Sequence, residues 1–525
     1  MKRFTGFALV FTFMLAAISP AGAQLLESDE VRDIDPHQGR ILADWITTEF
    51  QKRWKSEERQ APPVVDDATY LRRIYLDLLG TIPPVATARE FLNSEDPYKR
   101  DQVVELLLQR RRTAEHLAKV WRRMMVPTGS ANEMLGVQIE PWLRDQFQKN
   151  TPYDEFARSL LTVTSADVSD EKKSDAEKAN ARAAVMFYQA SGGDAEGAAD
   201  SVTRFFLGVR LGCAKCHDHP FASWKQEQFW GTAAFFAGVQ NGNVTDIRRE
   251  SIRPKDGDKD YPVRYLWTSI KAEIPKDKFP RHAFADWMTD NNNPNFAATA
   301  VNRVWRHLCG RSLAGDVDDL DEDAAEERKL ILDNLAKKFV ESKYDLRELI
   351  RGICKSRVYQ SSTLIIGQSA DSAMADVRPL KTLSPEQMFD AMEQALMLPV
   401  GRSDNGARFN GQGATLMQRM NEAFSGTPED FSAGIPQALM MMNGTIMSEA
   451  TNLEMSRTLR ATVDAPFLKD EDRLETLFLA ALTRRPSEKE QQVMLKYLAT
   501  QKDKKQAFGD IFWSLLNTPE FVLSR

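Results

Sequence analysis

Two of the four cysteines and two of the six histidines stand close together, in the stretch CAKCHDH at residues 213–219. The C-x-x-C-H pattern within it is typical of c-type haem attachment. Two thiols one helical turn apart can reach the two vinyl groups of one haem, and the histidine after the second thiol can ligate the iron. Cys213 and Cys216 are therefore the candidate haem-holding residues, and His217 is the candidate proximal ligand.

The two thiols also permit interpretations without haem. Cys213 and Cys216 could form a disulfide in an oxidising compartment, with a structural or a redox role. They could instead bind a divalent metal such as zinc. A closed structural zinc site needs four ligands, and His307 and Cys309 could supply the remaining two. The spacing of the cysteines leaves these alternatives open.

The histidines of the same stretch could serve a metal enzyme. His217 and His219 are possible metal ligands, and Asp218 could act as the base or orient a ligand. Three classes of function follow. The first is a c-type haem protein with a redox or electron-transfer role and a redox protein or cytochrome as partner. The second is a metal-dependent hydrolase that acts on extracellular polymer, and the third is a non-catalytic scaffold with a Cys213–Cys216 disulfide.

The N-terminal residues predict export. Lys2 and Arg3 form a positive start, residues 7–18 are apolar, and Ala21-Gly22-Ala23 is a small-residue cleavage pattern. We expect a signal peptide at residues 1–23 with cleavage near Ala23, and a periplasmic or extracellular location. No later stretch approaches the roughly 18 apolar residues of a membrane span, so we expect none in the mature chain. Export agrees with the haem hypothesis, because c-type haem is attached outside the cytoplasm.

The elements that must position the motif are mostly helical. Apolar residues at helical spacing recur through residues 24–243 and again through residues 280–525. Residues 244–279 contain Gly, Asp and Pro between short β-prone pieces such as 261–267. We therefore predict a mainly α fold with two helical domains joined by an irregular connector with a little β. The formal net charge of −6 argues against a nucleic-acid partner.

Several longer motifs resemble a known family. The stretches are YLRRIYLDLLGTIPP (70–84), AEHLAKVW (114–121) and FLGVRLGCAKCHDHPF (206–221) in the first half of the chain. Those in the second half are NPNF (293–296), VNRVWRHLCGR (301–311), VDD (317–319), SRVYQSS (356–362), PQAL (436–439) with Asn443, and LLNTPEF (515–521). In these stretches the chain resembles the secreted planctomycete-type cytochrome-associated proteins. That family pairs a cytochrome-associated domain with a C-terminal planctomycete domain, both of unknown function.

The resemblance bears on the remaining histidines. His116, His217, His219 and His307 all fall inside these stretches. We therefore consider a site shared between the two domains, in which His307 or His116 would be a metal ligand or the distal haem ligand. The family's biochemical role is unassigned, so the resemblance implies the domain pairing and the secreted location but no reaction.

Overall fold

The structure is a computed structural model. It describes residues 35–126, 133–218, 224–255, 257–268, 270–320, 326–363, 378–397 and 452–524. The expected signal peptide at 1–23, the candidate ligand His219 and the motif at 436–443 lie outside the described residues.

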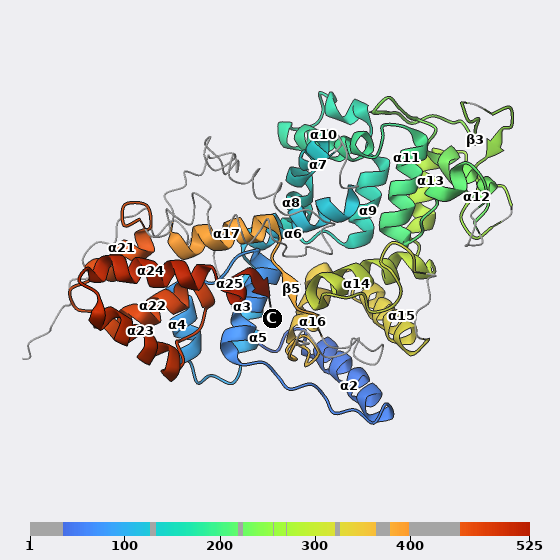
Figure 1. Cartoon of the computed structure of the whole chain (residues 1–525). Helices are drawn as coiled ribbons and strands as arrows, with labels where there is room; N and C mark the ends of the chain where they lie inside the picture. The colour runs from blue at the N-terminus through green and yellow to red at the C-terminus, as the bar shows by residue number, and fades with distance from the viewer. Residues whose placement is uncertain are drawn as a thin grey trace, which may run out of the picture.

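The first half of the chain forms helices joined by short turns (Figure 1). The α-helices are α2 (Arg40–Ser56), α3 (Asp67–Leu79), α4 (Val85–Asn93), α5 (Lys99–Leu108), α6 (Arg111–Met125), α7 (Glu133–Val137), α8 (Glu140–Lys149), α9 (Tyr153–Thr162), α10 (Asp175–Ala190), α11 (Ala195–Val202) and α12 (Gln226–Ala233). Among the described residues, short 3-10 helices accompany them at η1 (Ser165–Val168), η3 (Gly212–Lys215) and η4 (Ala234–Phe236). The segment η2 (Thr203–Leu207) is a π-helix that continues α11.

The strands form two-residue antiparallel pairs. β1 (Val239–Gln240) pairs with β2 (Asn243–Val244), and β3 (Ser251–Ile252) pairs with β4 (Tyr261–Pro262). In the third pair, β5 (Lys381–Thr382) joins β6 (Leu523–Ser524) near the end of the chain. The prediction of a mainly α fold with little β is confirmed.

Helices also dominate the second half. They are α13 (Pro280–Met288), α14 (Pro294–Cys309), α15 (Glu326–Glu341), α16 (Leu346–Lys355), α17 (Pro385–Leu396), α21 (Arg457–Asp464), α22 (Asp470–Leu482), α23 (Glu488–Thr500), α24 (Lys504–Leu516) and α25 (Pro519–Val522). Among the described residues, none of these or the earlier helices combines the length and the apolar character that crossing a membrane requires.

Local sequence signals set both ends of α3. The Asp66 side chain accepts a hydrogen bond from Thr69 N at 2.7 Å, which satisfies one of the free amides at the start of the helix. Gly80 ends α3 in the left-handed conformation, with φ of 67°. A Cβ at this position would collide with the His116 ring of α6. Glycine therefore allows both the helix end and the close approach of α6.

The hydrophobic core is shared between the two halves of the chain. One buried cluster contains Trp121 of α6 together with Val304 of α14 and Ile353 of α16. A second cluster combines α17, α22 and α24 with Leu76 and Ile82 from the first half. Figure 1 shows the blue α4 lying against the red helices of the C-terminal group, where it contacts α22. The predicted domain boundaries stay a prediction. Both core clusters contain residues from before and after the connector at 244–279.

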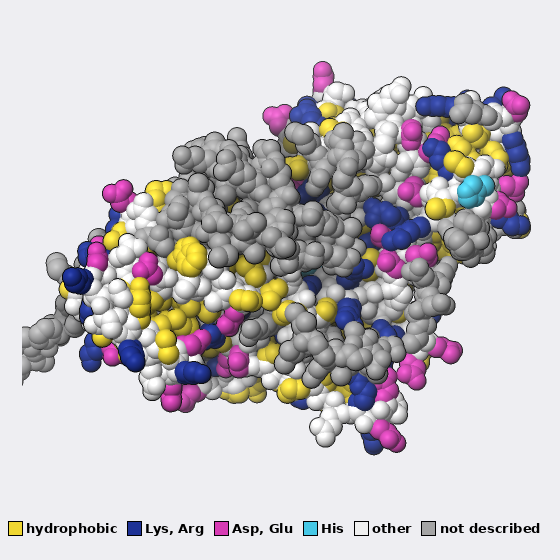
Figure 2. Space-filling view, in the orientation of Figure 1, with side chains coloured by type: hydrophobic (Ala, Val, Ile, Leu, Met, Phe, Trp, Pro, Cys, Tyr) yellow, Lys and Arg dark blue, Asp and Glu magenta, His cyan; other side chains and the backbone are white. Residues whose placement is uncertain are grey.

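The described surface mixes charges of both signs. In the face seen in Figure 2, Lys and Arg side chains stand among Asp and Glu side chains over the described surface, and neither positive nor negative side chains cover an extended patch.

Candidate functional site

The two motif cysteines lie in a short turn at the surface. In η3, Ala214 N donates to Leu211 O at 2.8 Å. The Ala214 side chain is fully buried and fixes the turn to the core, whereas Cys213 and Cys216 are exposed. All four cysteines lie in described residues, and none forms a disulfide there. Both motif thiols are therefore accessible to a group that arrives from solvent.

Helix α12 holds the far end of this turn. Gln226 Nε2 donates to the carbonyl oxygens of Lys215 at 3.1 Å and Cys216 at 3.2 Å. Trp230 Nε1 donates to the same Lys215 oxygen at 3.1 Å. The Lys215 side chain pairs with Glu196 of α11. These contacts fix the backbone of the turn without covering the sulfur atoms.

A backbone hydrogen bond selects the tautomer of His217. Its Nδ1 lies 2.7 Å from Asp218 O, and a carbonyl oxygen can only accept, so Nδ1 must carry the proton. In the neutral ring the lone pair is then on Nε2. The Asp218 carboxylate accepts from Gln226 N at 2.9 Å, which keeps this carbonyl in place. Histidines that bind metals use the same arrangement, with one nitrogen on the metal and the other donating to a carbonyl.

The other two candidate histidines meet elsewhere, at a buried junction between the two halves. The rings of His116 (α6) and His307 (α14) lie with their centroids 5.8 Å apart. His307 Nε2 lies 2.9 Å from Asp77 O of α3, and Lys381 donates to His307 O at 2.6 Å. None of the contacts described for His307 involves the cysteine turn. The structure thus brings His116 and His307 together and keeps His217 at the exposed turn.

The centre of this junction is a buried ion pair. The Asp77 carboxylate receives two hydrogen bonds from the Arg378 guanidinium, at 2.6 Å and 3.1 Å. The Tyr359 hydroxyl donates to the same carboxylate at 2.8 Å. Burial raises the pKa of Asp77, but the charges of Arg378 and then Lys381 outweigh burial and hold this pKa well below its usual range. Asp77 is therefore ionised at neutral pH and joins segments 301 residues apart.

Among the described residues, no group of three or more His, Cys, Asp and Glu side chains is placed to hold a metal ion. His219 lies outside the described residues, so the predicted ligand set of His217, Asp218, His219 and His307 stays a prediction.

Two family models match the chain, one in each half. Residues 46–241 match PSCyt2, described as a protein of unknown function (DUF1549), and residues 280–402 match PSD1, described as a protein of unknown function (DUF1553). The chain belongs to the planctomycete-type proteins that pair these two domains. No curated protein and no solved structure matches it. The family resemblance drawn from the motifs is confirmed, and we refer below to residues 46–241 as the PSCyt2 segment and to residues 280–402 as the PSD1 segment.

Sequence reasoning missed the residues that support the motif. Gln226 and Trp230 belong to the PSCyt2 segment and follow the cysteines within one short helix. Their spacing of four residues places both side chains on one face of α12. This spacing is the only sequence signal that could have identified the two residues, and it is unspecific because any amphipathic helix shows it. Asp77 and Arg378 carry no local signal for their pairing.

From the histidine pair at this junction we predict a loss of stability in mild acid. Burial, and then the charge of Lys381, lowers the pKa of His307 to about 4. Burial and then His307 lower the pKa of His116 as well. In the unfolded chain His307 becomes protonated as the pH falls below about 6.5, the ordinary histidine pKa. In the folded chain it stays neutral until about pH 4. Stability is therefore complete above pH 6.5 and declines as the pH falls toward 4.

Chemical denaturation at pH 7 and pH 5 measures this effect. For His307 alone we expect a loss of about 2 kcal/mol in the free energy of unfolding between these pH values. His307→Gln should reduce the pH-dependent loss by about that amount, while replacing the exposed His37 by Gln should leave the loss unchanged. An identical pH dependence in wild type and His307→Gln would show that His307 does not titrate in this way.

Proposed function

We propose that this planctomycete-type protein is exported and carries a c-type haem at its PSCyt2 segment, with a redox or electron-transfer role. Cys213 and Cys216 would hold the haem through thioether bonds, and His217 would be the proximal ligand of its iron. When bound, the haem would supply one-electron chemistry at the iron. The partner would be a redox protein or another cytochrome, in the periplasm or outside the cell.

The observation that carries this proposal is the state of His217. Its Nδ1 lies 2.7 Å from Asp218 O, so the free lone pair is on Nε2. A proximal ligand of haem needs this tautomer, because Nε2 ligates and Nδ1–H donates to a carbonyl. The free Nε2 of His217 is therefore a donor of the kind that a haem iron binds, which supports the proposal.

The two thiols add independent support. Cys213 and Cys216 are exposed and unpaired at the two ends of one turn. The backbone contacts from Gln226 and Trp230 keep this turn in place with the sulfur atoms accessible. Covalent attachment requires that a maturation enzyme can bring haem to both thiols, and a surface turn permits this. By contrast, the buried Cys309 and Cys354 offer no such access.

A pyridine haemochrome spectrum tests the proposal. The full chain is exported from a host with cytochrome c maturation machinery, beside a known cytochrome as control. We expect the spectrum of a haem with two thioether bonds in the purified protein. Protein without haem from a culture in which the control cytochrome matures would contradict the proposal.

The same preparation distinguishes the two alternatives. A mass two hydrogens below that of the reduced chain, with the loss mapped to Cys213 and Cys216, would indicate the disulfide scaffold. Intact thiols together with a bound divalent metal would indicate the metal-dependent enzyme at His217, Asp218 and His219.

A further inference from the structure

In the segment that leads into the cysteine turn, several backbone carbonyl oxygens have their hydrogen-bond donors outside the segment. α11 ends in the π-helix η2 (Thr203–Leu207), in which hydrogen bonds reach five residues rather than four. Gly208 follows in the left-handed conformation, with φ of 60°. Val209 N donates back to Thr203 O at 3.2 Å, while the carbonyl oxygens of the following residues need donors from elsewhere. π-Bulges of this kind are frequent at functional sites.

The PSD1 segment supplies those donors. Arg303 donates to the carbonyl oxygens of Arg204 at 2.8 Å and Phe205 at 2.9 Å. Asn295 Nδ2 donates to Leu207 O at 3.1 Å, and Leu320 N donates to Gly208 O at 3.0 Å. The backbone between α11 and the turn is therefore held by side chains and backbone about a hundred residues away.

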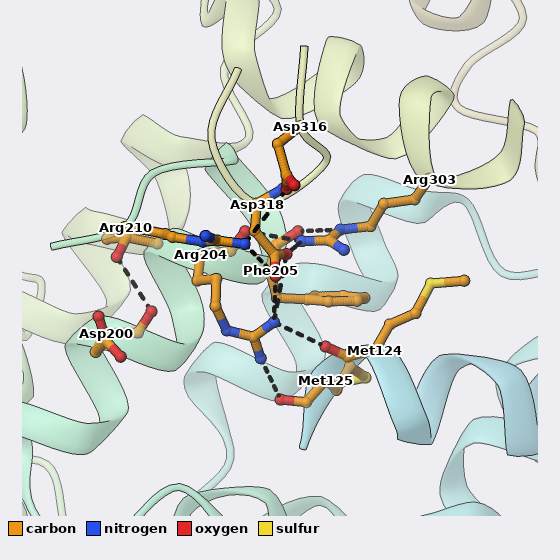
Figure 3. A network of polar contacts seen from close by, with 10 residues as sticks. Met124, Met125, Asp200, Arg204, Phe205, Arg210, Arg303, Asp316 and Asp318 are labelled. Carbon is orange, nitrogen blue, oxygen red and sulfur yellow. Dashed lines mark hydrogen bonds and ion pairs between the residues drawn. The ribbon is translucent and has the colours of Figure 1, made fainter. Parts of the chain in front are cut away.

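Asp318 connects the side chains of this contact (Figure 3). Its carboxylate pairs with Arg303 at 2.5 Å and with Arg204 at 3.2 Å, and Arg210 approaches it at 3.7 Å. Burial raises the pKa of Asp318, but the charges of Arg303 and Arg204 outweigh burial and lower it. Asp316 receives a hydrogen bond from Asp318 N at 2.7 Å and lies 3.5 Å from Arg210. One partly buried carboxylate of the PSD1 segment thus fixes Arg303 and Arg204 and lies within ion-pair distance of the exposed Arg210.

These contacts reach the residue beside Cys213. Arg204, held by Asp318, also donates to the carbonyl oxygens of Met124 and Met125 at the end of α6. Asp200 lies one turn before Arg204; burial raises the pKa of its carboxyl group, while the charge of Arg204 and the backbone N–H of Gly212 act to lower it. A Cβ on Gly212 would lie 3.1 Å from the Asp200 carboxylate. Gly212 is the first residue of η3 and directly precedes Cys213.

We propose that Asp318 and Arg303 of the PSD1 segment are positioning residues for the turn that carries Cys213 and Cys216. They act through Arg204 and the η2 backbone, and they do not contact the thiols. What the thiols hold rests on the proposed function, but the positioning itself does not. A second domain paired with the cysteine motif then has a physical role, because the turn depends on contacts from residues 295–320.

Amide hydrogen exchange in the reduced, haem-free full chain tests this assignment. Asp318→Asn removes the charge that orders the arginines and keeps the shape of the side chain. We expect the peptide covering residues 211–216 to exchange at least about tenfold faster in Asp318→Asn than in wild type. When both proteins are exported from a host that matures c-type cytochromes, we expect Asp318→Asn to carry less covalent haem per chain than wild type.

Glu105→Gln is the matched control. Glu105 is a buried carboxylate of one half that pairs with Arg351 and Lys355 of the other half, but it has no part in the turn. We expect this variant to lose global stability without faster exchange at 211–216. Equal exchange of this peptide in Asp318→Asn and Glu105→Gln would contradict the assignment.

Arg303→Lys provides a second test if Asp318→Asn does not fold. Lys keeps a positive charge beside Asp318 but cannot reproduce the two Arg303 hydrogen bonds to the carbonyl oxygens of Arg204 and Phe205. We expect at least about threefold faster exchange at 211–216 in this variant, and unchanged exchange would contradict the assignment. Wild-type protein without haem would overturn the proposed function, while the exchange comparison would still decide the role of Asp318.

Discussion

Replacing Asp77 by Asn is expected to lower the free energy of unfolding by about 3–5 kcal/mol, because the change leaves a buried cation without its counter-charge. Arg378 is 4% exposed and makes both of its ion-pair hydrogen bonds to Asp77. The Tyr359 hydroxyl would also lose a charged acceptor.

Urea denaturation of the full chain at pH 7 measures this loss. Asp464→Asn is the matched control, because Asp464 forms an ion pair with Lys505 in which both side chains are exposed. We expect the control to change the free energy of unfolding by less than about 0.5 kcal/mol. If Asp77→Asn does not fold, Tyr359→Phe should still show a loss of about 1–3 kcal/mol. A loss below 1 kcal/mol in Asp77→Asn would contradict the central role of this ion pair.

Replacing Cys213 and Cys216 together by Ala is expected to abolish covalent haem. Each thiol would form one thioether bond, so the double variant has no attachment point. The measured quantity is the amount of haem that stays bound to the polypeptide after acid–acetone extraction. We expect His217→Ala to lose the proximal ligand and to yield little or no stable haem protein.

The other two cysteines form the matched control for this experiment. Burial raises the pKa of Cys309 to about 12 and that of Cys354 well above its usual value, so both stay protonated and unreactive. Replacing Cys309 and Cys354 by Ala should therefore leave the attached haem unchanged. Haem that depends on these buried cysteines, and not on Cys213 and Cys216, would overturn the assignment of the site.

Local features of this chain could be read from the sequence. Asp66 and Gly80 mark the two ends of α3, and the apolar spacing between them predicts the helix. Asn293, Pro294 and Gly310 mark α14 in the same way. The motif at 213–217 likewise places its thiols in one turn, since their spacing is local. Such signals act over a few residues and are therefore visible in one sequence.

The partners of the buried polar groups could not be read in this way. Asp77 pairs with Arg378, and Arg303 donates to the backbone of Phe205, across separations of 301 and 98 residues. Only tertiary packing brings such groups together, and the local spacing of residues in the sequence does not predict which distant groups will meet. The histidines of the family motifs hinted at a shared site. Two of them, His116 and His307, do meet between the halves, but at the Asp77 junction rather than at the cysteine turn.

The mass of the peptide that spans Cys213 to His217 tests the haem assignment most directly. The full chain is exported from a host that matures c-type cytochromes, digested without reduction and analysed by mass spectrometry. The account predicts a peptide heavier by one haem, with both cysteines modified. An unmodified or disulfide-bonded peptide, from a culture in which a control cytochrome carries its haem, would contradict it.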